Sequence, residues 1–127
     1  MVSKPEILRD RSKKFAIQVV ELFRSLPKTD EAKVIGKQLL RSATSVAANY
    51  RAVCRSRSRV EFISRMGIVV EEADETVFWL EMLEETRIVG KEKIESVLVE
   101  ANELLAIFAA SQRTAKANKT ISSPVAK

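Results

Sequence analysis

Four long stretches of this 127-residue chain carry apolar side chains at every third or fourth position, which is the spacing of one face of an α-helix. Breaks between these stretches are few, because the sequence contains only three glycines and three prolines. An all-β fold needs frequent tight turns, and the chain has little material for them. The pattern predicts an all-α protein, specifically an antiparallel up-down four-helix bundle.

Capping signals place the first two helices. Ser3, with a glutamate three residues later and a proline in the first turn, forms a capping-box pattern that predicts a helix start. This helix is expected to end at Pro27. A second helix is expected from about residue 31 to 53, with either Thr29 or Asp30 as its N-cap.

The second half of the chain repeats this logic. Ser58 and Glu61 form another capping-box pattern, so the third helix is expected to begin at once and to run to about Ile88. Gly90 is the expected stop, since glycine commonly follows a helix end. The fourth helix is expected over residues 91–117.

Length and composition bound the organisation and the chemistry. We expect one bundle domain over residues 1–118 and a disordered, basic tail over 119–127. The single cysteine cannot form an internal disulfide, and no apolar run is long enough for a membrane span, so a cytoplasmic protein without membrane contact is expected. Histidine is absent, which excludes Ser-His and Cys-His catalysis and almost all zinc sites. We therefore expect no enzyme, no metal and no cofactor.

Charge is unevenly distributed along the chain. Residues 1–67 hold 15 Lys/Arg against 6 Asp/Glu, a net +9, whereas residues 68–110 hold 3 against 11, a net −8. The remainder carries +4, which gives the overall +5. Such a split indicates complementary faces within or between subunits, and an exposed basic region that could attract a polyanion.

The turn between the second and third helices concentrates the arginines. The stretch "NYRAVCRSRSRVEF" at positions 49–62 contains four of them, and a fifth follows just inside the third helix. Guanidinium groups match phosphate oxygens bidentately, so the cluster predicts a nucleic-acid contact, although a solvated helical turn remains an equal interpretation. Because no base-reading motif is present, binding would be to the phosphate backbone and independent of sequence. The candidate residues are Arg51, Arg55, Arg57, Arg59 and Arg65.

The same turn predicts how the second and third helices face each other. With the hairpin centred near residue 56, antiparallel neighbours have numbers that sum to about 112. Ser45 is then expected to face Gly67, and Arg41 is expected near Glu71 and Glu72. The small residues around Ser45 indicate close helix packing and not catalysis, since no base is available to activate a serine.

An acidic cluster occupies the third helix. Glu71, Glu72, Asp74 and Glu75 lie within two turns, and paired carboxylates can bind a divalent metal or act as acid and base. No histidine or second carboxylate helix completes such a site. We therefore favour pairing of these acids with arginines of the second helix or of a neighbouring subunit.

Three further side chains carry predictions. Trp79 lies at the border of the apolar face, where it is either a core-edge residue or an anchor for a subunit contact. Asn49 is expected to be buried and hydrogen-bonded to the backbone of the turn. Cys54 has arginines nearby that could lower its pKa, but we favour burial as a small apolar side chain.

Positions 38–83, "QLLRSATSVAANYRAVCRSRSRVEFISRMGIVVEEADETVFWLEML", resemble a bacterial four-helix-bundle protein family. This group includes proteins encoded in intervening sequences of large-subunit ribosomal RNA genes. It is more distantly similar to the accessory variability protein of diversity-generating retroelements. The matching positions are Gln38, Leu39, Arg41, Ser42, Ala43, Ser45, Val46, Ala48, Asn49, Arg57, Ser58, Glu61 and Phe62. The commoner family pattern has a glycine in the turn after the asparagine, and this chain has none there.

The resemblance implies an antiparallel bundle that assembles as a homopentamer around a central channel, without known enzymatic activity. The retroelement relative uses a basic pentameric barrel to bind nucleic acid and a reverse transcriptase. In such a ring, the basic first half of one subunit could meet the acidic helix of the next. The expected function is a non-catalytic, homo-oligomeric scaffold that binds RNA or DNA through a basic surface. The alternative is a protein–protein interaction module without a physiological nucleic-acid ligand.

Overall fold

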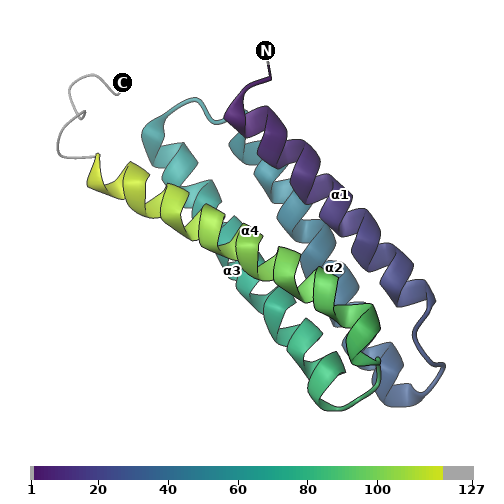
Figure 1. Cartoon of the computed structure of the whole chain (residues 1–127). Coiled ribbons are helices and arrows are strands. Elements are labelled where there is room, and N and C mark those ends of the chain that lie inside the picture. The colour runs from purple at the N-terminus through teal and green to yellow at the C-terminus, as the bar shows by residue number, and fades with distance from the viewer. Residues whose placement is uncertain (1, 119–127) are drawn as a thin grey trace.

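The structure, a computed structural model, describes residues 2–118 and contains four α-helices in an antiparallel bundle. Helix α1 spans Lys4–Arg24, α2 spans Asp30–Val53, α3 spans Arg59–Glu85 and α4 spans Lys91–Ala117. Each helix runs opposite to the one before it, with a short turn between them (Figure 1). The described residues contain no strand, which confirms the predicted all-α bundle. The predicted tail over 119–127 lies outside the described residues.

Local capping explains where the helices begin. Ser3 and Glu6 form the reciprocal capping box predicted for α1, and Pro5 lies in its first turn. The N-cap of α2 is Thr29, whose hydroxyl accepts from the Ala32 backbone N–H at 3.3 Å. Ser58 caps α3 by accepting from the Glu61 N–H at 3.0 Å. These starts agree with the sequence prediction.

The end of α3 differs from the prediction. The helix stops at Glu85 and not near Ile88, because Arg87 takes a left-handed conformation with φ 61°. The N–H groups of Ile88 and Val89 then turn back to the Leu83 carbonyl, at 3.1 and 3.4 Å. This early closure buries Val89 against the core. Gly90, with φ −66°, is the N-cap of α4 and not the residue that terminates α3.

The apolar faces of all four helices meet in one core. Its largest fully buried side chains include an aromatic residue of α4 and a methionine of α3. Tyr50 stacks at a tilt on Phe108, with ring centroids 5.2 Å apart, and burial raises the pKa of Tyr50 to about 12. The largest fully buried apolar side chains are Val19, Leu39, Val46, Met66, Val69, Leu80, Leu83, Ile94, Leu104 and Phe108. None of the four helices within residues 2–118 is long and apolar enough to cross a membrane.

The bundle places the α2–α3 turn beside the beginning of α1, at one end of the molecule (Figure 1). The thiol of Cys54 lies 3.8 Å from the Pro5 carbonyl oxygen, which marks this contact. The turn contains no glycine and needs none, since Arg87 is the only residue with positive φ among the described part of the chain. This packing brings charged side chains of α1 next to the arginines at the end of α2 and in the turn that follows.

Candidate nucleic-acid interface

A basic groove lies between α1 and α2 near the α2–α3 turn. Its volume is about 620 Å³, and we call it the first groove. Four cationic side chains line it, together with one carboxylate and several small or neutral residues. The lining residues are Arg9, Asp10, Lys13, Thr44, Ala47, Ala48, Arg51, Cys54 and Arg55.

Helix geometry explains why these cations converge. Arg9 and Lys13 are one turn apart on α1 and therefore point to one side of it, whereas Arg51 lies in the last turn of α2 and Arg55 in the turn that follows that helix. The antiparallel packing of α1 on α2 then sets the two pairs against each other. The small side chains of Ala47 and Ala48 leave the space between them open. The resulting site can hold a phosphate-sized anion between guanidinium and ammonium groups.

The sequence-predicted arginines do not all share this groove. Arg51 and Arg55 line it, whereas Arg57, Arg59 and Arg65 do not. Arg57 is exposed and Arg59 is half-buried. The predicted cluster is therefore two arginines of the turn region joined by two cations of α1. Sequence reasoning missed Arg9 and Lys13, although their one-turn spacing on the polar face of α1 was a usable signal.

Arg65 is engaged in closing the hairpin. Its guanidinium donates to the Ala52 carbonyl oxygen at 2.7 Å and pairs with Glu61 at 3.3 Å. The Glu61 carboxylate also accepts from the Arg57 backbone N–H at 2.7 Å. This backbone hydrogen bond, followed by the charges of Arg65 and Arg57, lowers the pKa of Glu61. Arg65 thus satisfies a carbonyl at the end of α2 instead of facing the groove.

The prediction for Cys54 was wrong. The residue is exposed at the rim of the first groove, because it follows the last residue of α2 and the turn carries it outward. Local desolvation raises the pKa of the Cys54 thiol, and the charge of the nearby Arg9 lowers it. The desolvation effect is the larger, so the pKa of the thiol lies above its ordinary value. Its position therefore gives neither a buried apolar residue nor a reactive thiolate.

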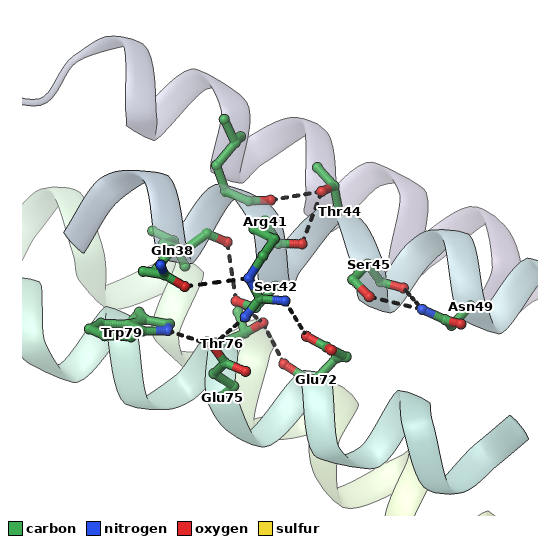
Figure 2. Close-up of polar contacts among 12 residues, drawn as sticks. Gln38, Arg41, Ser42, Thr44, Ser45, Asn49, Glu72, Glu75, Thr76 and Trp79 are labelled. Atoms are coloured by element: carbon green, nitrogen blue, oxygen red, sulfur yellow. Dashed lines mark hydrogen bonds and ion pairs between the residues drawn. The ribbon is translucent and has the colours of Figure 1, made fainter. Parts of the chain in front are cut away.

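A polar network joins α2 to α3 (Figure 2). Arg41 donates to Glu72 at 3.1 Å and also pairs with Glu75, while Gln38 accepts from it at 3.4 Å. Trp79 donates its indole N–H to the same Glu75 carboxylate at 3.0 Å. The Trp79 hydrogen bond and the Arg41 pair together lower the pKa of Glu75.

Two acids of the predicted cluster therefore pair with an arginine of α2, the interpretation that the sequence favoured. Arg41 reaches Glu72 as predicted, but its second acid is Glu75 and not Glu71, which is exposed. Within residues 2–118 no group of three or more potential ligands is arranged to hold a metal ion. Trp79 is half-buried and packs against the core, with the ring of Phe78 edge-on at 4.8 Å.

Two side-chain positions predicted for α2 and α3 have different contact partners in the structure. Asn49 donates to the carbonyl and hydroxyl of Ser45, at 2.9 and 2.8 Å, within its own helix and not to the turn (Figure 2). Gly67 does not face Ser45: a Cβ on it would lie 3.1 Å from the Gln112 side chain of α4, the only described side chain within 4 Å. The cause is the helix register, since the close Ser42–Thr76 contact has numbers that sum to 118 and not about 112.

Comparisons with known proteins agree with this fold. The family model described as "23S rRNA-intervening sequence protein" matches residues 6–110. A crystal structure from Bacteroides thetaiotaomicron VPI-5482, described as a protein with unknown function from the S23 ribosomal protein family, superposes with a TM-score of 0.77. The two sequences are 34% identical over 87% of this chain and 99% of that one. No curated protein gives a significant match.

Proposed function

The chain belongs to the 23S rRNA-intervening sequence protein family, and from that premise we propose that it is a non-catalytic, homo-oligomeric protein that binds nucleic acid through the first groove. The observation that carries the proposal is the convergence of Arg9, Lys13, Arg51 and Arg55 on one open space with a single carboxylate, Asp10, which pairs with Arg9 at 3.4 Å. Arginine and lysine side chains on an open groove are the groups that neutralise phosphates.

The groove favours recognition of the backbone over recognition of bases. Its walls between the cations are Thr44, Ala47 and Ala48, which offer little hydrogen-bonding capacity. Base reading requires side chains that reach base edges in bidentate pairs, and the cations here sit on the flank of a helix hairpin instead of on a helix that enters a groove. We therefore propose sequence-independent binding whose affinity falls as salt rises.

The test is binding of a fluorescent RNA or DNA oligonucleotide, followed by anisotropy at fixed salt. A variant with Arg9, Lys13, Arg51 and Arg55 all changed to alanine is expected to lose at least about tenfold in affinity, because four phosphate contacts are removed. The matched control removes four exposed cations of α4: Lys91, Lys93, Arg113 and Lys116. Equal affinities of the two variants would contradict the proposal, as would a wild-type protein that does not bind.

We also propose assembly into a homopentamer through the outer face of α3. Three large apolar side chains are exposed along that helix: Val60 at 72%, Ile68 at 44% and Phe78 at 48%. Val60 and Phe78 are eighteen residues, or five turns, apart and therefore point the same way, and Ile68 lies between them about 80° round the helix. A band of exposed apolar side chains along one helix is a candidate subunit contact. Light scattering is expected to give five times the 14.3 kDa chain mass, and Phe78→Ser is expected to reduce it. A wild-type monomer would contradict this part of the proposal.

The charge pattern supports a second candidate function, a protein–protein interaction module. The acids Glu71, Asp74 and Glu81 are exposed on α3, and their charge complements the first groove. If α3 of a neighbouring subunit fills the groove, the arginines there are assembly contacts. The same four-alanine variant separates the two functions. Under the nucleic-acid proposal it stays oligomeric and loses nucleic acid, whereas under the alternative it dissociates.

A further inference from the structure

A second basic groove lies at the other end of the α1–α2 hairpin. Its volume is about 420 Å³, and we call it the second groove. Four cationic side chains line it, with no carboxylate among the lining residues. These residues are Phe23, Arg24, Leu26, Pro27, Lys28, Ala32, Lys33 and Lys37.

The two grooves open on the same face of the hairpin. On α2, Lys37, Thr44 and Arg51 follow at intervals of seven residues, close to two helical turns, so they point the same way. On α1, Arg24 lies eleven residues after Lys13, close to three turns, so it also keeps that direction. At 1.5 Å per residue these intervals put the two charge sets roughly 20 Å apart.

Between the two grooves, no cationic side chain in the described part of the chain points out from this face of the hairpin. By the same helix spacing, Val20 of α1 and Leu40 of α2 lie between the grooves, and both are half-buried. The nearest arginine, Arg41, is turned toward α3 and pairs with Glu72 there. The face is thus a neutral strip between two clusters of four cations each.

We infer that this face binds a double helix laid across the hairpin, with one phosphate backbone in each groove; the inference rests on the proposed function and names its substrate class. A duplex presents phosphates as two ridges separated by a groove, and the major groove of B-DNA is about 12 Å wide between its walls. Phosphate groups facing each other across it are further apart than that width. Two cation clusters with a neutral strip between them match such a pair of ridges.

A single strand fits this face less well. A strand running along the hairpin would set its central phosphates on Val20 and Leu40, where no cation neutralises them. Proteins that bind single strands combine a basic groove with aromatic side chains on which bases stack. Among the described residues, the face offers no series of stacking platforms: Phe15 and Tyr50 are buried, and Phe23, which lines the second groove, is half-buried against Gly36.

Anisotropy titrations with a roughly 16-base-pair DNA duplex and its single strand of the same length test the inference. Wild-type protein is expected to bind the duplex at least about tenfold more tightly than it binds the single strand. Changing Arg24, Lys28, Lys33 and Lys37 to alanine is expected to remove about tenfold of the duplex affinity, whereas the α4 control variant keeps it. All four side chains are exposed, so the fold is expected to persist.

The outcomes separate this inference from the proposed function. If the second-groove variant binds the duplex as wild type does, or if the single strand binds as tightly as the duplex, the inference is overturned while the first groove keeps its proposed role. If wild-type protein binds neither form, both fail together.

Discussion

The hydroxyl of Thr76 on α3 lies 2.9 Å from the hydroxyl of Ser42 on α2, and both residues are buried (Figure 2). The Ser42 hydroxyl donates to the Leu39 carbonyl at 3.2 Å, so its lone pairs remain available to accept from Thr76. The single Thr76 hydroxyl proton is shared between the Ser42 oxygen and the Glu72 carbonyl oxygen, which lies 2.7 Å away. Because both side chains are short, the Ser42–Thr76 contact forms only in the observed register of α2 against α3.

A double-mutant cycle on this pair measures its contribution. Thr76→Val keeps the shape of the side chain and removes the hydroxyl, and Ser42→Ala does the same for its partner. We expect a coupling free energy of about 1 kcal/mol in urea unfolding, typical of one buried hydrogen bond. Thr44→Val is the matched control, since Thr44 is exposed and bonds only carbonyls of its own helix. A zero coupling for the pair would contradict the assignment.

The two glycines inside helices are expected to respond oppositely to alanine. A Cβ on Gly36 would lie 2.7 Å from Leu26 Cδ1 and 3.1 Å from the Phe23 ring, both packed at the α1–α2 contact. A Cβ on Gly67 would meet only the end of the Gln112 side chain, which can move. Gly67→Ala is therefore expected to stabilise the protein by up to about 1 kcal/mol through helix propensity. Gly36→Ala is expected to destabilise it, and thermal unfolding compares the two.

Stability is expected to fall in acid partly through Glu75. The Trp79 N–H and Arg41 hold the pKa of its carboxyl below the usual range in the folded chain. The unfolded chain therefore takes up this proton first as pH drops, so the stabilisation is present above the unfolded pKa and is lost as pH falls through the folded pKa. Glu75→Gln should flatten the loss of stability below about pH 4.5, whereas the exposed control Glu71→Gln should flatten it less. Identical profiles for both variants would contradict this role.

Arg11 is expected to be the main polar tie between α1 and α4. It donates to both oxygens of Glu100, at 2.7 and 2.8 Å, and also pairs with Glu103. Arg11→Lys keeps the charge but loses the bidentate geometry. It should lower the free energy of unfolding, measured with a chemical denaturant, by about 1 kcal/mol. Arg24→Lys on the exposed surface of the same helix is the control, with no expected effect on stability. An equal effect of the two changes would rule out the tie.

Local sequence signals correctly predicted much of the fold. Ser3 and Ser58 cap the helices that the sequence assigned to them, and Thr29 is one of the two N-caps predicted for α2, because capping depends only on residues within one turn. The end of α3 was misplaced because Arg87, not a glycine, takes the left-handed conformation. The left-handed conformation of Arg87 allows Val89 to be buried in the core. Burial of this kind is a tertiary contact, so it cannot be predicted from the neighbouring residues alone.

The candidate site was predictable only in part, because it joins two helices. Arg51 and Arg55 stand out in the sequence as members of a cluster. Arg9 and Lys13 look like ordinary polar-face residues until α1 is packed on α2. The exposure of Cys54 and the contact of Gly67 with Gln112 also depend on helix register, which the turn length predicted to within about a turn and which differs in the structure.

The salt dependence of duplex binding tests the central claim most directly, namely that the α1–α2 face neutralises phosphates with its two clusters of four cations. Neutralising eight phosphates predicts a slope of about −7 in log K against log salt for wild-type protein. The variant that lacks Arg9, Lys13, Arg51 and Arg55 is expected to give about half that slope. A slope near zero, or a slope unchanged in this variant, would contradict the claim.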